Sequence, residues 1–251
     1  TCSDEEFENI MKEVYNAFIK DKNTLEFTVE CGRPDSITKE KLMVLKEQGV
    51  SRISINPQTM NQETLDLIGR KHTIEQVKEA FWMARECGMD NINMDFIVGL
   101  PEETPEMVRY SMEEAMKLEP DGITIHSLAI KRASRLSMNK QKYSELSMEN
   151  STELMNITKE YAYKMGMKPY YLYRQKNMAG NQENVGYSKP GKEGLYNILM
   201  MGDYQDVWAV GAGAVTKLLS EDRKSATRID TLKNVDLYIE RVDEMIERKR
   251  D

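Results

Sequence analysis

The sequence predicts an α/β protein with a parallel sheet that forms part of a barrel. Five segments rich in strand-forming residues alternate with longer segments whose apolar residues recur at helical spacing. Strands joined by helical crossovers pair in parallel. No Gly-x-Gly-x-x-Gly turn follows a strand, and no Walker-type Gly-Lys-Ser/Thr sequence is present, so two common nucleotide-binding folds lack support. A barrel or partial barrel is the better prediction.

The expected elements run through nearly the whole chain. The strands are expected at 25–30, 51–56, 91–98, 122–128 and 169–173. The helices are expected at 4–20, 38–48, 61–69, 73–86, 104–118, 147–165 and 231–249. The Gly- and Asn-rich stretch 177–194 is expected to be an ordered loop.

Local signals justify the early elements in order. Apolar residues at helical spacing predict the first helix, and the alternating LEFTVE segment predicts the strand after it. Ser36 or Thr38 caps the second helix, and Gly49 ends it. The strand SRISIN comes next, and Asn61 is a plausible cap for the short helix that follows.

The later elements carry clearer signals. Thr73 and Gln76 fit a capping box at the start of the fourth helix, which ends at Gly88. The segment NINMDFIV is the next strand, and Pro105 stands at the first position of the helix after it. The strands GITIHSL and PYYLY complete the alternation. We expect residues 1–173 to form the partial barrel and residues 174–251 a C-terminal accessory region.

Composition excludes several classes of protein. Asp plus Glu number 42 against 35 Lys plus Arg, a net charge of −7, which disfavours general binding to nucleic acid. No apolar run reaches the length of a membrane span, and no secretory leader stands at the start. Cys2, Cys31 and Cys87 are too few and too scattered for a disulfide framework or a metal site. A cytoplasmic location is expected.

Polar residues gather where the predicted strands end. In parallel barrels the functional groups lie at the carboxyl ends of strands. Glu30, Gln58 and His126 stand at or near such ends, and Asp95 lies inside an apolar strand, where an unpaired carboxylate is costly. The loop and short helix after Gln58 could return Arg70 to the same edge.

These residues also have purely structural interpretations. Asp95 could cap a helix or pair with an arginine, and Glu30 could form a structural ion pair. Gln58 could brace a loop, while Arg70 could be a solvated surface group. His126 could be a satisfied core histidine, and His72 a surface residue at a helix start.

Together, however, Glu30, Gln58, Arg70 and Asp95 fit one kind of ligand. Carboxylate and amide groups suit a ribose diol, and an arginine suits a carboxylate in bidentate fashion. A glutamate suits an ammonium group. A ligand with all three features is a nucleoside that bears an amino acid.

The motifs then resemble a known family. The segments EFTVECGRPDSIT, RISINPQTMNQETLDLIGRKHT and NINMDFIVGLPEETPE resemble radical S-adenosylmethionine (SAM) enzymes of the oxygen-independent coproporphyrinogen III oxidase, or coproporphyrinogen dehydrogenase, group. The segments YYLYRQKNMAGNQENVGY and WAVGAGAVTK are similar to the coproporphyrinogen dehydrogenase-like branch found in Gram-positive bacteria. The resemblance covers essentially the whole chain and implies a partial (β/α)6 barrel with C-terminal helix and loop additions.

The resemblance also implies roles for the residues in the SAM site. Glu30 would hold the methionyl ammonium or the ribose, and Gln58 and Asp95 would hold the ribose hydroxyls. Arg70 would bind the methionyl carboxylate, and the backbone near Ile97 would lie against the adenine.

The resemblance implies roles for further residues, with weaker support. A second SAM would lie near 211–214, at Gly211 and Ala212. The candidates for contact with the substrate or for closing the site are Tyr173, Arg174, Gln175 and Asn177. The basic residues Lys131, Arg132, Arg135 and Arg174 could bind the substrate's carboxylates, although 131–135 could equally be a solvated loop.

The chain departs from the family in one decisive respect. The family binds a [4Fe–4S] cluster through a Cys-x3-Cys-x2-Cys loop, and no such triplet is present here. The chain also opens on a helix rather than a strand. The ligands of the cluster and the first barrel strands are therefore expected in a longer protein, with a natural variant that has lost the chemistry as the alternative.

The implied reaction of the complete enzyme is oxidative decarboxylation of coproporphyrinogen III in haem biosynthesis. A hydrogen is taken from a propionate, and loss of CO2 and an electron leaves a vinyl group. A reducing protein such as flavodoxin or ferredoxin would be the electron donor. The isolated chain is expected to be inactive.

Three rival functions remain. The first is a haem-binding chaperone of the same family, for which His72 and His126 are the available histidines. The second is a radical SAM reaction on another substrate, because fold does not fix function. The third is a structural partner subunit without a cluster.

Overall fold

The chain forms two compact units, Thr1–Gly194 and Leu195–Asp251. The structure is a computed structural model that describes residues 2–128, 152–174 and 182–250. The expected boundary between residues 173 and 174 remains a prediction. None of the helices in these ranges is both long and apolar enough to cross a membrane.

The first unit is built on a six-stranded, mostly parallel sheet with the spatial order β1-β2-β3-β4-β6-β5. The strands are β1 Thr28–Glu30, β2 Arg52–Gln58, β3 Ile92–Val98, β4 Gly122–Ser127, β5 Lys168–Tyr173 and β6 Asn184–Ser188. Strands β1 to β4 pair in parallel, and β6 runs antiparallel to both of its neighbours. The α/β prediction is confirmed, and so are all five predicted strands.

Strand β6 was not expected, since its residues fall in the predicted loop 177–194. It is short, and Gly186 interrupts its strand-forming residues. The glycine is required there, because a Cβ at this position would lie 1.9 Å from Cε1 of Tyr171 on β5. Local pattern could not show this contact, which arises only when β5 and β6 pair.

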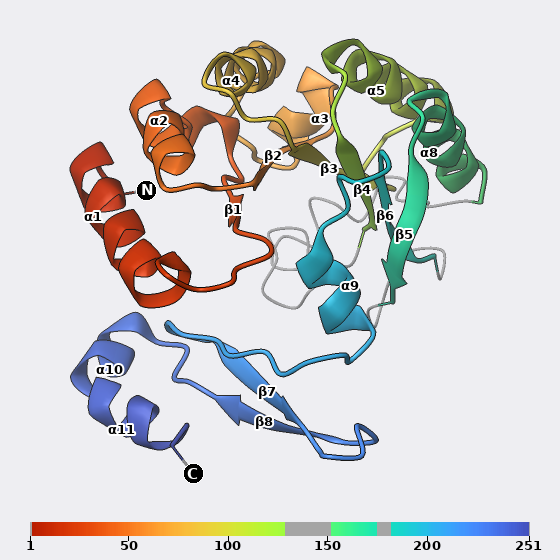
Figure 1. Ribbon diagram of the computed structural model, residues 1–251. Coiled ribbons are helices and arrows are strands. Elements are labelled where there is room, and N and C mark those ends of the chain that lie inside the picture. Colours follow the sequence, from red (N-terminus) through yellow and green to blue (C-terminus); the bar gives the residue numbers. More distant parts are fainter. Residues whose placement is uncertain (1, 129–151, 175–181, 251) are drawn as a thin grey trace. The chain divides into compact units, whose positions relative to one another are not determined.

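Helices cover the outer side of this sheet (Figure 1). They are α1 Asp4–Val14, α2 Lys39–Glu47, α3 Gln62–Leu67, α4 Ile74–Glu86, α5 Pro105–Leu118 and α8 Thr152–Lys164. A π-helical turn, Tyr15–Ile19, extends α1, and a 3-10 turn, Pro34–Ser36, precedes α2. The Thr73–Gln76 capping box and the Thr38 cap are confirmed. Asn61 stands at the N-cap of α3, but its side chain makes no capping hydrogen bond.

The hydrophobic core lies between the sheet and these helices. Successive residues of a strand point to opposite faces, so alternate residues of each strand enter the core. Ile55 of β2, Phe96 of β3 and Phe81 of α4 are all at most 1% exposed. The opposite, inner face of the sheet is therefore left for the polar residues.

The second unit contains a β-hairpin and short helices. Its elements are α9 Leu195–Met201, β7 Val215–Leu219, β8 Ala226–Asp230, α10 Val235–Glu240 and α11 Val242–Glu247. The expectation of helix and loop additions missed the antiparallel β7–β8 pair. The helix expected at 231–249 is also wrong in extent, because Asn234 caps α10 and the backbone leaves helical geometry at Arg241.

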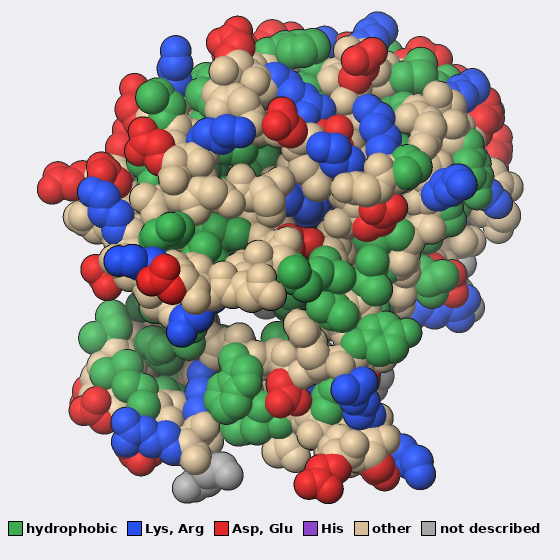
Figure 2. Space-filling view, in the orientation of Figure 1, with side chains coloured by type: hydrophobic (Ala, Val, Ile, Leu, Met, Phe, Trp, Pro, Cys, Tyr) green, Lys and Arg blue, Asp and Glu red, His purple; other side chains and the backbone are tan. Residues whose placement is uncertain are grey.

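On the face shown in Figure 2, basic and acidic side chains are interspersed rather than gathered by sign. On the part of this face that the structure describes, the basic side chains form no continuous surface.

Candidate functional site

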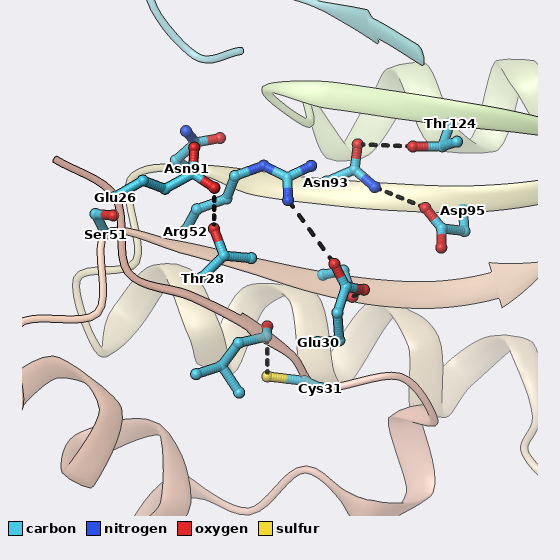
Figure 3. A network of polar contacts seen from close by, with 12 residues as sticks. Glu26, Thr28, Glu30, Cys31, Ser51, Arg52, Asn91, Asn93, Asp95 and Thr124 are labelled. Carbon is cyan, nitrogen blue, oxygen red and sulfur yellow. Dashed lines mark hydrogen bonds and ion pairs between the residues drawn. The ribbon is translucent and has the colours of Figure 1, made fainter. Parts of the chain in front are cut away.

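The inner face of the parallel strands carries a network of polar side chains (Figure 3). Arg52 and Ser54 of β2 lie beside Asn93 of β3. Asn93 accepts a hydrogen bond from Thr124 of β4 at 3.3 Å. Such a polar inner face is unusual for a parallel sheet, because parallel strands are usually apolar on both faces. It therefore indicates a binding surface.

Glu30 is held at the end of β1 by two residues of the neighbouring strand. Ser54 Oγ donates a hydrogen bond to Glu30 Oε2. Arg52 Nη1 lies 3.9 Å from Glu30 Oε1, and the Arg52 side chain is only 5% exposed, whereas that of Glu30 is 63% exposed (Figure 3). The carboxylate is thus oriented from behind while part of it stays open to a cationic ligand.

Gln58 ends β2 in a strained backbone conformation. Its φ is +71°, which non-glycine residues rarely adopt, and the pairing with β3 shifts register just before it. Gln58 Nε2 donates to Asn56 O at a long 3.4 Å, and the residue is 8% exposed. Backbone strain of this kind clusters at functional sites.

Arg70 follows α3 and is partly buried. Its guanidinium forms no hydrogen bond or ion pair with the described residues. Burial lowers the pKa of Arg70, the positive charge of Arg33 lowers it further, and Asp35 acts in the opposite direction. Arg33 is itself paired with Asp35. Among the described residues, Arg70 is therefore a cation whose guanidinium donors have no partner, an arrangement that suits a carboxylate ligand.

Asp95 projects from β3 toward the next strand. It accepts a hydrogen bond from Asn93 Nδ2 at 2.7 Å, and its Oδ2 lies 3.6 Å from His126 Nε2 on β4. Among the described residues it neither caps a helix nor pairs with an arginine. One of its oxygens faces a histidine that is itself 29% exposed, so the pair can receive a hydroxyl-bearing ligand.

The remaining strand residue of the predicted site, Ile97, lies beside His126 in the register of β3 and β4. Tyr173 of β5 reaches the same histidine, with its hydroxyl 3.4 Å from His126 Nδ1. His126 is thus no core histidine but joins Asp95 to Tyr173.

His72, expected at the surface, is completely buried, and its Nε2 lies 3.2 Å from Pro57 O.

The other predicted residues are not part of the polar network on the inner face of the sheet, as far as the structure describes them. Arg174 is exposed and forms an ion pair with Glu183 at 3.0 Å. Gly211 and Ala212 belong to the second unit, where Thr231 donates a hydrogen bond to Gly211 O. The remaining candidates lie outside the described residues: Lys131, Arg132, Arg135, Gln175 and Asn177.

The chain does not provide a cluster site within the ranges that the structure describes. No group of three or more His, Cys, Asp or Glu side chains there is arranged to hold a metal. The thiols of Cys2, Cys31 and Cys87 are free. Burial, followed by the charge of Glu30, raises the pKa of Cys31 to about 12, which opposes thiolate ligation.

Sequence reasoning missed the residues that support the site. Arg52 and Ser54 hold Glu30, and Asn93 holds Asp95. Their signal was present in the alternation of polar and apolar residues along SRISIN and NINMD. Such alternation means that one face of the strand is polar, which is unexpected for a sheet buried on both sides.

Known proteins are similar to this chain in sequence. The sequence profile of the radical SAM superfamily matches residues 3–115. The oxygen-independent coproporphyrinogen-III oxidase-like protein HemZ of Bacillus subtilis (strain 168) is 44% identical over 245 residues, 98% of this chain and 49% of that protein. The heme chaperone HemW of the same bacterium is 30% identical over 217 residues, 85% of this chain and 53% of that protein.

A solved structure shows the same fold. Coproporphyrinogen III oxidase HemN from Escherichia coli aligns with a TM-score of 0.72 at 19% identity, covering 97% of this chain and 54% of that one. The chain spans about half the length of the curated relatives it matches. By its sequence, the chain belongs to the radical SAM superfamily, in the group of oxygen-independent coproporphyrinogen III oxidases and their relatives.

Proposed function

We propose that this chain is the SAM-binding part of an enzyme that oxidatively decarboxylates a porphyrinogen. One observation carries the proposal: Glu30, Gln58 and Asp95 lie at or near the ends of three adjacent parallel strands, and Arg70 stands unpaired among the described residues. A carboxylate that is oriented but open, a nearly buried amide and a free guanidinium fit the ammonium, ribose and carboxylate of SAM.

The chain's own residues would bind and orient this cofactor. Arg70 would bind the methionyl carboxylate and Glu30 the ammonium, while Gln58 and Asp95 would hold the ribose hydroxyls. When bound, SAM supplies the radical that removes a hydrogen atom from the substrate. The described residues do not fit a [4Fe–4S] cluster, so no role in ligating it falls to them.

The proposed substrate is a porphyrinogen with propionate side chains, as the name of the HemZ relative suggests. Loss of one hydrogen atom from the β-carbon, followed by loss of CO2 and one electron, converts a propionate into a vinyl group. The electron requires an acceptor, and generating the radical requires a donor such as flavodoxin or ferredoxin. Tyr173 and His126, on the same inner face as Asp95, lie where this side chain would approach.

The test uses a complete protein that contains this chain together with a cluster-binding segment. The protein is reconstituted with iron and sulfide under anaerobic conditions and supplied with SAM, a reductant and coproporphyrinogen III. Chromatography should show products with one and then two carboxylates fewer, and Asp95→Asn should abolish them. A reconstituted protein that cleaves SAM but leaves the porphyrinogen unchanged would refute the proposed substrate.

A haem chaperone is the second candidate, because HemW is 30% identical to this chain and His126 is partly exposed. Under this alternative the complete protein binds haem and transfers it to an apo-haemoprotein without converting coproporphyrinogen. His72, being fully buried, is a poor axial ligand. Loss of the haem absorption band in His126→Ala would favour the chaperone.

A further inference from the structure

A second set of polar contacts lies directly after Gln58. Thr59 Oγ1 donates to Glu103 Oε1 at 2.7 Å and lies 3.2 Å from Ser111 Oγ. Asn61 Nδ2 donates to Thr59 Oγ1 at 3.0 Å and to Ser111 Oγ at 2.9 Å. We call Thr59, Asn61, Glu103 and Ser111 the 59–111 network.

The network fastens the loop between β2 and α3 to helix α5. The backbone N–H of Met60 donates to Ser111 Oγ at 3.0 Å, and that of Asn61 donates to Thr59 Oγ1 at 3.3 Å. Asn61 Nδ2 also reaches Met107 O at 3.0 Å. These contacts explain why Asn61 does not cap α3: its amide is engaged by α5.

The 59–111 network holds the backbone directly after Gln58. Pairing with β3 fixes the strand on the N-terminal side of Gln58, while the 59–111 network fixes the three residues on its C-terminal side. A non-glycine residue at φ +71° costs about 1–3 kcal/mol and persists only where its surroundings impose it. The network is the part of those surroundings that lies after the strand.

Glu103 is the final acceptor of this network and lies close to the proposed nucleoside contacts. Gln58, Ile97, Glu103 and Ser111 line one small cavity of about 10 Å³, room for about one water molecule. The other residues that line it, from the β2–α3 loop, β3 and α5, are uncharged. Among the residues that the structure describes, Glu103 therefore faces hydroxyl, amide and apolar groups and no counter-ion.

We propose that the 59–111 network positions Gln58 for the nucleoside, and that proton loss from Glu103 loosens it and weakens binding. The positioning role rests on the proposed function, because Gln58 is a nucleoside contact only under that proposal.

The electrostatics of Glu103 support this geometry. Burial raises the pKa of Glu103 to about 7, and the hydrogen bonds from Thr59 and Asn61 act in the opposite direction. Below that pH the side chain is neutral and the apolar surroundings of the cavity are tolerated. Above it, a partly buried charge with no counter-ion among the described residues is relieved when water enters or the loop moves away from α5. Either change removes support from Gln58.

The experiment compares the wild-type chain with four variants: Glu103→Gln, Thr59→Val, Ser111→Ala and the control Glu106→Gln. Glu103→Gln keeps the oxygen that accepts from Thr59 but cannot ionise. Glu106 lies on the first turn of α5 and is exposed. The dissociation constant of labelled SAM is measured from pH 6 to 8 by equilibrium dialysis. Hydrogen exchange of peptides covering residues 58–61 is measured at the same pH values.

The affinity of the wild type for SAM should fall by up to about tenfold from pH 6 to 8, as expected when binding requires a neutral group with this pKa. The affinity of the wild type divided by that of Glu103→Gln should fall by the same factor over this pH range. Because SAM titrates equally in both measurements, its own titration does not affect this ratio. Glu106→Gln should follow the wild type. Thr59→Val and Ser111→Ala should bind about fivefold to tenfold more weakly at every pH and exchange faster at Met60 and Asn61.

The two proposals fail differently. If wild type and Glu103→Gln share one pH profile, the role of Glu103 is overturned. If Thr59→Val and Ser111→Ala leave exchange at 58–61 unchanged, the network does not position Gln58, whatever SAM does. If the wild type binds no SAM at any pH, the nucleoside site of the proposed function fails, and exchange in the variants still decides whether the network holds the loop.

Discussion

Asp95 and His126 face each other across adjacent parallel strands, with Oδ2 of the carboxylate 3.6 Å from Nε2 of the imidazole. The other Asp95 oxygen accepts from Asn93, and the other His126 nitrogen lies 3.4 Å from the Tyr173 hydroxyl. The pair therefore joins β3, β4 and β5 on one face. It places a carboxylate whose orientation is set where the proposed ribose would lie.

Replacing Asp95 with Asn should weaken binding of SAM by about tenfold or more, because a charged acceptor for hydroxyl donors becomes a neutral amide. The fold should be preserved, since the new amide oxygen can still accept from Asn93 Nδ2. Isothermal titration with SAM measures the effect. Asp90→Asn, at an exposed position before the same strand, is the matched control, and equal losses in the two variants would count against the site.

Replacing Arg70 with Met should also lower the affinity for SAM by about tenfold or more, because a charge-assisted contact with the methionyl carboxylate is lost. The loss should be much smaller for S-adenosyl ligands that lack this carboxylate. Arg109→Met is the control. Arg109 is exposed on α5, and its ion pair with Glu160 is long, at 3.9 Å. If Arg70→Met weakened both kinds of ligand equally, the carboxylate assignment would be wrong.

Glu103→Gln should change how stability depends on pH. The pKa of Glu103 is raised from 4.5 to about 7 in the folded chain, so its contribution is fully present below pH 4.5 and is lost as pH rises through 7. The free energy of unfolding of the variant, minus that of the wild type, should therefore rise by about 1–3 kcal/mol from pH 4.5 to pH 8. Urea unfolding at both pH values measures this gain. A difference that does not change with pH would show that Glu103 does not titrate abnormally.

Gly186→Ala should destabilise the β5–β6 pair by about 1–3 kcal/mol, because the new methyl group and the Tyr171 ring cannot occupy the same space. In a double variant that also carries Tyr171→Ala, the two losses should be less than additive. The check is a double-mutant cycle by urea unfolding. Strict additivity would mean that the two residues are not in contact.

Most of the fold could be predicted from the sequence because strand alternation and helix signals are local. The Thr73–Gln76 capping box, Pro105 and the strands β1 to β5 are examples. Strand β6 was missed for a physical reason, because it is held by pairing with β4 and β5, where Gly186 lies against Tyr171. The β7–β8 hairpin was missed although its two strands are close in the sequence.

Part of the candidate site could likewise be predicted from the sequence, and part could not. Glu30, Gln58 and Asp95 could be proposed as site residues because polar groups at or near strand ends in a parallel sheet meet at one edge. The alternation of SRISIN places Arg52 and Ser54 on one polar face, but their contact with Glu30 emerges only from the register of β1 against β2. The burial of His72 and the raised pKa of Glu103 depend on the packed surroundings of each side chain, which no local pattern contains.

The central claim is that the ends of β1, β2 and β3 form a nucleoside site together with Arg70. Adding SAM to an isotopically labelled chain, and following side-chain signals by NMR, tests it most directly. The account predicts that the Ile97 methyl groups and the side-chain amides of Gln58 and Asn93 shift in a saturable way, and that in Asp95→Asn the saturation needs about tenfold more SAM or higher. Signals that stay in place while SAM is bound, or that move only in the second unit, would contradict it.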